Sequence, residues 1–224
     1  RGYGGDVLNT SIYLSRLVGA DATVRFTTLL GKDPFSSEMI AAWEREGINC
    51  DTVGRLTERN AGLYFVRTDK TGERTFHYWR SQSAAREIMG EDWADLRAQA
   101  MGSDWIYLSG ITLAILDDTG RERLLSELSV ARESGALIAF DGNFRPTLWT
   151  DPVDAAPWHA QVWNLCGLAL AGFEDEAALF GDATPERSLD RLKSYGIAEI
   201  VIKRGPQSVF LHTNGATQFI DVTP

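Results

Sequence analysis

The segment Asp141-Gly-Asn143-Phe-Arg145 places three polar side chains at alternate positions, directly after the apolar run 136–140. Alternate residues of an extended chain point to the same side, so residues 141, 143 and 145 share one side for as long as the extended backbone lasts. In open α/β sheets, ligands bind outside the carboxyl ends of the strands. The segment therefore indicates a binding site, although Asp-Gly-Asn followed by Pro146 is also ordinary turn chemistry.

Basic residues near the ends of predicted strands favour an anionic ligand. They are Arg80, Arg145, Lys203 and Arg204. Taken singly, each is better explained as a solvated surface charge. The net charge of -9 and the pI of about 4.9 make most of the surface repel polyanions. We therefore expect neither nucleic acid nor a membrane as a partner, and only a small anion at a local basic cluster.

Residues 61–80 contain two alternating runs joined by Asp69-Lys-Thr-Gly72, a pattern typical of an antiparallel hairpin. The second run puts Phe76, Tyr78 and Arg80 on one face, so aromatic rings and a guanidinium point the same way. We predict a lid hairpin inserted into the domain. The alternative is an edge hairpin that its charges keep soluble.

The loop Gly4-Gly5-Asp6-Val-Leu-Asn9 directly precedes a predicted helix, so its backbone N–H groups are suited to ligand oxygen atoms. A simple helix-capping loop explains this motif equally well. The dinucleotide pattern GxGxxG and the P-loop pattern GxxxxGK[ST] are absent from the sequence. A Rossmann dehydrogenase and a P-loop kinase are therefore unsupported.

Helical and strand patterns alternate along the chain, which predicts a mostly parallel sheet covered by helices. The predicted helices are 7–18, 34–46, 93–101, 121–133 and 185–195. The predicted strands are 24–30, 105–109, 136–141 and 199–203, followed by a hairpin of 208–213 with 217–222 around Asn214-Gly215. The residues expected to face the core from the first two helices are Val7, Leu14, Leu17 and Val18, then Phe35, Met39, Ala42 and Trp43.

The 224 residues, 44% of them hydrophobic, are enough for one sizeable core and one domain. No apolar run approaches the roughly 20 residues that cross a bilayer, and the chain does not open on a signal-peptide pattern. The two cysteines, Cys50 and Cys166, form no CxxC, which favours a reducing cytoplasm without disulfides or zinc. His77, His159 and His212 suggest no catalytic relay.

Five motifs occur in a fixed order, and together they resemble those of the ribokinase-like (PfkB-type) carbohydrate kinases over nearly the whole chain. They are the segments 4–9, 30–35, 78–80, 141–146 and 201–205. Segments 72–80, 108–116 and 140–149 are most similar to family members that act on 2-keto-3-deoxygluconate. The resemblance implies a three-layer α/β/α sandwich with a mostly parallel central sheet and a small β lid.

The activity implied by this resemblance is transfer of the γ-phosphoryl group of ATP to the 6-hydroxyl of 2-keto-3-deoxygluconate, with Mg²⁺ required. A fructokinase-type activity and a non-catalytic sugar-binding relative stay open as alternatives. A lid with one exposed face is suited to pair with its twin, so a homo-oligomer through the lid is also considered.

The resemblance also implies site residues. Those for the sugar acid are Gly5, Asp6, Asn9, Tyr64, Tyr78, Arg80 and Arg145, and those for the nucleotide are Asn143, Arg145, Lys203, Gly205 and Ser208. Arg80 would offer a bidentate fork to the substrate carboxylate. Arg145 would be catalytic by neutralising the phosphoryl group in transfer. Glu176 would organise Mg²⁺ through water.

The sequence departs from the family pattern in two ways. Phe173 stands where an Asn is expected three residues before Glu176, which weakens the metal assignment. The chain stops at Pro224 before the Gly-Ala-Gly-Asp segment that carries the family's catalytic base and anion hole, and it lacks the strand that precedes Gly-Gly. We therefore expect residues 1–224 to be an internal fragment of one ribokinase-like domain, with the hairpin 61–80 inserted in it.

Overall fold

The computed structural model describes residues 2–70 and 72–222, except the side chains of Arg74 and Phe76. The chain divides into two compact units, Arg1–Ala100 (unit 1) and Met101–Pro224 (unit 2).

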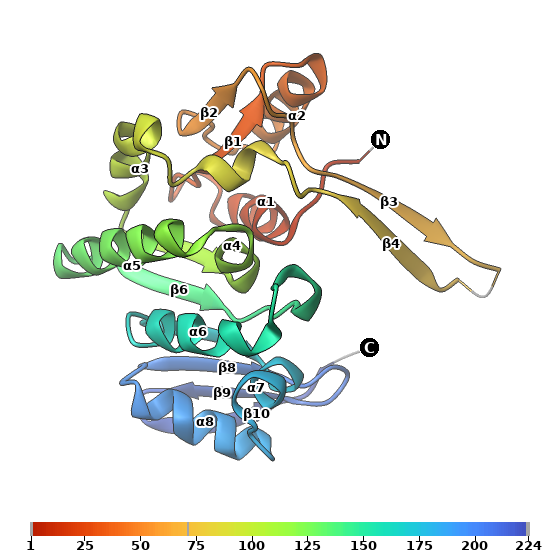
Figure 1. Cartoon of the computed structure of the whole chain (residues 1–224). Helices are drawn as coiled ribbons and strands as arrows, with labels where there is room; N and C mark the ends of the chain where they lie inside the picture. The colour runs from red at the N-terminus through yellow and green to blue at the C-terminus, as the bar shows by residue number, and fades with distance from the viewer. Residues whose placement is uncertain (1, 71, 223–224) are drawn as a thin grey trace. The chain divides into compact units, whose positions relative to one another are not determined.

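Among the described residues, unit 1 has two short parallel strands, three α-helices and the hairpin described below (Figure 1). Its elements are α1 (Asp6–Val18), β1 (Thr28–Gly31), α2 (Pro34–Arg45), β2 (Val53–Leu56) and α3 (Ala94–Met101), with short 3-10 turns at Ala84–Glu87 and Glu91–Trp93. Helix α2 begins where predicted, because Asp33 accepts a hydrogen bond from Ser36 N at 3.0 Å and Pro34 occupies the first turn.

The core of unit 1 differs in part from the predicted helix faces. One buried cluster consists of Leu8, Leu30, Trp43 and Ile48, and Leu29 is also completely buried. Trp43 was predicted, but Leu14, Leu17 and Phe35 are exposed. Helix α1 instead turns Leu8, Ser11 and the half-buried Ile12 inward, and Ser11 is tolerated because its hydroxyl donates to Val7 O at 2.9 Å. Because Ser11 is polar, the hydrophobicity pattern did not reveal this buried face of α1.

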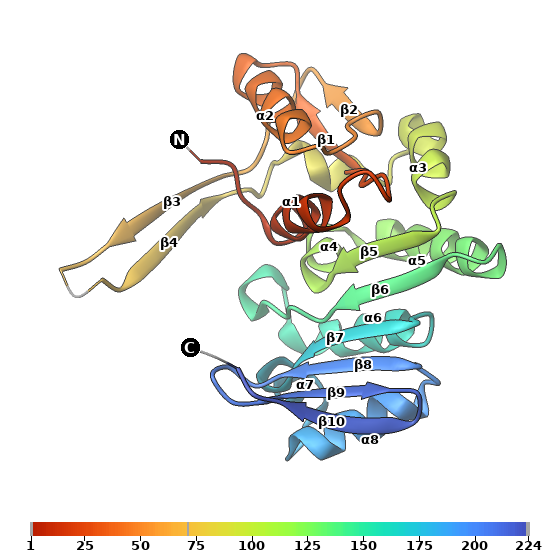
Figure 2. The same cartoon turned by 180° about the vertical axis from the view of Figure 1, so that it is seen from behind.

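The predicted hairpin is confirmed. Strands β3 (Leu63–Thr68) and β4 (Arg74–Trp79) pair antiparallel from Leu63↔Trp79 to Thr68↔Arg74. In Figures 1 and 2 the hairpin extends away from β1, β2 and α2 of the same unit. Every described side chain of β3 is exposed.

Unit 2 is a six-stranded sheet in the order β10-β9-β8-β7-β6-β5. The strands are β5 (Trp105–Ser109), β6 (Leu137–Asp141), β7 (Leu168–Gly172), β8 (Glu199–Lys203), β9 (Val209–Thr213) and β10 (Ala216–Ile220). Strands β5 to β8 are parallel, and β9 and β10 form the predicted antiparallel hairpin. Its turn residues Asn214 and Gly215 both have positive φ, as a tight two-residue hairpin requires.

Helices cover one face of this sheet (Figures 1 and 2). They are α4 (Gly110–Ile115), α5 (Asp118–Glu133), α6 (Ala155–Trp163), α7 (Phe173–Phe180) and α8 (Pro185–Ser194), with 3-10 turns at Pro146–Leu148 and Pro152–Asp154. Strands β2 and β7 and helices α4 and α7 were not predicted, and the predicted strand 24–30 is reduced to Thr28–Gly31. Within residues 2–70 and 72–222, no helix has the length and apolarity to cross a membrane.

Candidate active site

The glycine loop before α1 lies against the hairpin. Helix α1 starts at Asp6, and Asn9 N donates to Gly5 O at 2.8 Å, so the predicted sugar-binding residues occupy the first helical turn and the residue before it. A Cβ placed on Gly4 would lie only 2.8 Å from the Tyr64 hydroxyl oxygen, so a side chain there would collide with the tyrosine. Glycine thus allows the loop and the hairpin residue Tyr64 to approach closely.

The inner face of the hairpin carries three of the predicted residues together. Tyr64 and Tyr78 are directly opposite in the register, with ring centroids 6.0 Å apart. The Arg80 guanidinium lies 4.1 Å from the centroid of the Tyr78 ring, which holds the cation on this face. Arg80 Nε is buried with no hydrogen-bond partner among the described residues. The predicted common face is confirmed for Tyr78 and Arg80, and the Phe76 side chain lies outside the described residues.

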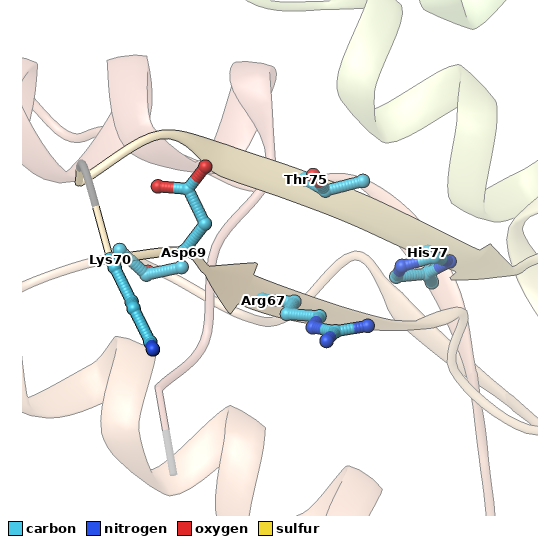
Figure 3. Close-up of a pocket in the computed structure, with 6 residues that line it drawn as sticks. Arg67, Asp69, Lys70, Thr75 and His77 are labelled. Carbon is cyan, nitrogen blue, oxygen red and sulfur yellow. The ribbon is translucent and has the colours of Figure 1, made fainter.

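The outer part of the hairpin contains a separate hollow, shown in Figure 3. It is lined by Arg67, Thr68, Asp69, Lys70, Thr75 and His77. None of these residues belongs to the predicted sugar site, and Tyr64, Tyr78 and Arg80 do not line this hollow.

In unit 2, the carboxyl ends of the parallel strands gather the second group of predicted residues. The register aligns Ser109 with Asp141 and Gly172 with Lys203, so the segments that follow β5 to β8 leave the sheet at one edge. Lys203 Nζ lies 3.0 Å from both carboxylate oxygens of Asp141. Lys203 is therefore held by an acidic residue that the site prediction did not include.

Arg145 lies beyond this edge with its side chain half exposed. Its Nη1 donates to Phe144 O at 2.7 Å and lies 3.9 Å from Asp175 Oδ1. Burial raises the pKa of Asp175, while the charge of Arg145 opposes that shift. Asn143 has φ of 32°, a left-handed conformation that Asn tolerates better than most residues. The two side chains remain at the sheet edge, where the sequence predicted them.

The residues after β8 that were predicted to bind the nucleotide form a tight local turn. Gly205 has φ of 57°, which suits glycine. Arg204 donates from Nε to Ser208 O at 2.7 Å and from Nη2 to Ser208 Oγ at 2.6 Å, and its guanidinium lies 4.4 Å from the Phe210 ring centroid. The Ser208 hydroxyl accepts from Arg204 and, as a hydroxyl, also carries a proton to donate to a ligand. Arg204 thus positions Ser208.

Glu176 is completely buried in the first turn of α7. Its Oε2 accepts from Arg191 Nη2 at 2.6 Å, and the same Nη2 contacts Asp182 Oδ2 at 2.6 Å. Burial raises the pKa of Glu176 to about 7, although Arg191 draws it down. Its Oε1 has no hydrogen-bond partner among the described residues and lies 3.0 Å from where a Cβ on Gly142 would be. One carboxylate oxygen is therefore anchored, and the other is an unused acceptor beside the Asp141–Arg145 segment.

Comparison with known proteins identifies the family. All 224 residues match the family described as pfkB family carbohydrate kinase. The chain belongs to this family of carbohydrate kinases. It is 42% identical over 217 residues to the 2-dehydro-3-deoxygluconokinase of Dickeya dadantii, covering 96% of this chain and 70% of that protein. The enzyme of the same name from Escherichia coli K12 is 41% identical with the same coverage.

Solved structures of pfkB proteins share the fold. A PfkB protein from Polaromonas sp. JS666 superimposes with a TM-score of 0.84 at 25% identity, over 97% of this chain and 72% of that one. The 2-dehydro-3-deoxygluconokinase of Thermotoga maritima gives a TM-score of 0.81 at 23% identity, over 97% and 70%. The predicted ribokinase-like fold is confirmed, and as a pfkB kinase the chain is a phosphotransferase that acts on a sugar hydroxyl.

The roles of individual residues in this pfkB kinase stay predictions. Sequence reasoning missed the partners of the predicted residues. These partners are Asp141 for Lys203, Asp175 for Arg145, Arg191 for Glu176, and Arg204 for Ser208. Asp141 carried a signal because it opens the alternating Asp-x-Asn-x-Arg segment, and Arg204 carried one because it follows a predicted strand.

Proposed function

We propose that the full-length protein phosphorylates the 6-hydroxyl of 2-keto-3-deoxygluconate, which is 2-dehydro-3-deoxygluconate, with ATP as the phosphoryl donor. The identity of about 40% to 2-dehydro-3-deoxygluconokinases over 96% of the chain carries this proposal. The fructokinase of Vibrio alginolyticus is only 26% identical over 92% of the chain, so fructokinase activity is the weaker alternative.

The substrate preference follows from the inner face of the hairpin. Two tyrosine rings and one guanidinium form an amphipathic surface suited to a small acid sugar. We propose that Arg80, stacked on Tyr78, pairs with the substrate carboxylate. Its buried Nε lacks a partner among the described residues, which supports an incoming acceptor. Gly5, Asp6 and Asn9 are proposed to receive the sugar hydroxyls.

The phosphoryl-transfer residues are proposed to act by charge and position. The sugar 6-oxygen forms a bond to the γ-phosphorus while the bond from that phosphorus to ADP breaks, and negative charge shifts onto the leaving oxygen. Arg145 stabilises this charge, Asn143 orients the phosphates, and Lys203, Gly205 and Ser208 line the nucleotide. We propose that the hydroxyl proton passes to a base, a role that is not assigned to any of residues 1–224.

A magnesium ion fits the donor set. Mg²⁺ usually keeps several waters and uses one or two carboxylates together with substrate phosphates. The unpartnered Oε1 of Glu176 is suited to accept from a metal-bound water, which agrees with the proposed indirect role. When bound, the ion would neutralise phosphate charge. Within the described residues, no group of three His, Cys, Asp or Glu side chains is placed to hold a metal ion.

Replacing Arg80 by Ala is expected to raise KM for 2-keto-3-deoxygluconate by about 10- to 100-fold, because a charge-assisted hydrogen bond contributes about 1.5–3 kcal/mol. KM for a neutral ketose such as fructose is expected to change little. Both are measured by coupled ADP release. Arg67→Ala on the outer face of the same hairpin is the matched control. Equal losses for the acid and the neutral sugar would refute the carboxylate contact.

We also propose a cytoplasmic protein that self-associates through the outer face of the hairpin. This face exposes Leu63, Phe65 and Trp79, and the Phe65 and Trp79 rings pack edge to face at 5.5 Å. A two-stranded hairpin is marginally stable without a covering surface. A second copy supplies the same apolar face in a symmetric pairing.

Trp79→Glu is expected to reduce the mass of the full-length protein to that of one chain, because it puts a charge on the apolar face proposed as the interface. Light scattering coupled to size-exclusion chromatography measures this mass. Glu73→Gln at the exposed end of the hairpin is the control and should leave the wild-type assembly intact. An unchanged assembly in Trp79→Glu would rule out this interface.

A further inference from the structure

His159 is a buried imidazole that the proposed reaction does not use directly. It lies in the middle of α6 and is completely buried. Its Nε2 is 3.1 Å from Gly142 O, and its Nδ1 is 2.9 Å from Ala155 O. Burial lowers its pKa, and the two carbonyl oxygens oppose the shift. A buried polar ring surrounded by aromatic residues therefore has a specific contact with the loop that follows β6.

The contacts of His159 follow a pattern along that loop. Its ring centroid lies 5.5 Å from that of Phe140 and 6.1 Å from that of Phe144, and its Nε2 contacts Gly142 O between them. The three even positions 140, 142 and 144 therefore all contact one imidazole. The odd positions 143 and 145 carry residues proposed for phosphoryl transfer, and Asp141 holds Lys203.

The loop needs such a support because strand pairing ends before it. The ladder between β6 and β7 stops at Asp141. The next peptide is crowded, since a Cβ on Gly110 would collide with Gly142 O and lie 2.7 Å from His159 Nε2. Asn143 then takes φ of 32°, a strained conformation that persists only when its surroundings fix it. Phe144 is buried directly after it.

We propose that His159 is a positioning residue for phosphoryl transfer, which holds Gly142 and Phe144 so that Asn143 and Arg145 keep their reactive orientation. This inference rests on the proposed function. We assign the imidazole proton to Nε2. Ala155 O already accepts a helical N–H from the residue four positions later, so it does not need the ring proton. Gly142 O lies beyond the last pair of the β6–β7 ladder and therefore needs a donor. Without that proton, Gly142 O would be a buried acceptor facing a lone pair.

Three substitutions separate positioning from packing. Gln carries an amide N–H₂ near the place of Nε2, Asn carries one near the place of Nδ1, and Phe keeps only a ring. We expect His159→Phe and His159→Asn to lower kcat by about 10- to 100-fold, since a shift of about 1 Å in a catalytic group has an effect of this size. His159→Gln should stay within about 5-fold of wild type. KM for the sugar acid should change less than about 3-fold in all three, because the sugar is assigned mainly to unit 1.

His212→Phe is the matched control. His212 is also buried in unit 2, and its Nδ1 lies 2.9 Å from Thr217 Oγ1, but strands β7 and β8 separate its strand β9 from β6. It should lower thermal stability and leave kcat within about 3-fold. If His159→Phe behaves like His212→Phe, or if Gln and Asn at 159 lower kcat equally, the positioning role is overturned.

Nuclear magnetic resonance tests the same inference without turnover. The wild-type protein should show an attached proton on His159 Nε2, and backbone shifts of residues 142–145 should move in His159→Phe but not in His159→Gln. A proton on Nδ1 alone, or unmoved shifts in both, contradicts the proposal. If the wild type shows the expected proton and shifts but releases no ADP with sugar acids, the proposed function is refuted. The contact by which His159 supports this loop would then still stand.

Discussion

Replacing Arg145 by Ala in the full-length protein is expected to lower kcat by about 100- to 1000-fold, the usual effect of removing one donor that stabilises transition-state charge. The guanidinium is half exposed at the sheet edge, held by Phe144 O on one side and near Asp175 on the other. It is therefore oriented yet open to a ligand. Because the sugar acid is assigned mainly to the hairpin and the glycine loop, its KM should change by less than about 5-fold. Coupled ADP release at saturating ATP measures both constants.

Two further substitutions define this role. Arg145→Lys keeps the charge and loses the planar fork, so its kcat should lie between those of wild type and Arg145→Ala. Arg132→Ala, an exposed arginine on α5, is the control and should keep wild-type kcat. An Arg145→Ala enzyme with unaltered kcat would refute the electrostatic role.

Removing Arg191 is expected to lower the free energy of unfolding by about 3–5 kcal/mol, because it leaves the buried carboxylate of Glu176 without its cation. Urea unfolding of Arg191→Ala at pH 8, with a chelator present, measures this loss. The deficit should shrink between pH 8 and pH 5. The pKa of Glu176 is about 7 with Arg191 in place and rises further without it, so at low pH the folded protein takes up a proton and the missing cation matters less.

A second substitution tests the cause. Glu176→Gln removes the buried charge, so adding it to Arg191→Ala should recover part of the lost stability, and the two effects should not add. Arg187→Ala, exposed on the same helix α8, should change stability by less than about 0.5 kcal/mol. The loss of unfolding free energy in Arg191→Ala could instead be equal at pH 5 and pH 8 and additive with Glu176→Gln. In that case the loss comes from missing packing against Phe180.

The sequence predicted the elements whose patterns are local. Strands β5 and β8 have the predicted limits, and the β9–β10 hairpin forms at Asn214-Gly215 because both residues accept positive φ. Strand β7 was missed because its buried residues are Ala169 and Ala171, too small to stand out in a hydrophobicity pattern. Helix α7 begins with Phe173 and three acidic residues, which resemble a polar loop.

For the site, the sequence predicted which residues face ligands but not what holds them. Asn143 and Arg145 come from one short segment, so their alternation is visible in the order of the residues alone. His159 and Arg191 lie 17 and 15 residues from the atoms that they contact, and only helix packing brings them there. A lone histidine or arginine in a helical pattern carries no sign of such a partner. Supporting residues are therefore found from the fold.

The residues proposed to recognise the sugar, apart from Arg145, all precede residue 101, and those proposed for phosphate chemistry all follow it. Mutations before residue 101 can therefore change which sugar is accepted, while the residues proposed for phosphoryl transfer stay the same. In a kinase with this division, small changes in a glycine-rich turn and a two-stranded ribbon are enough to alter sugar preference.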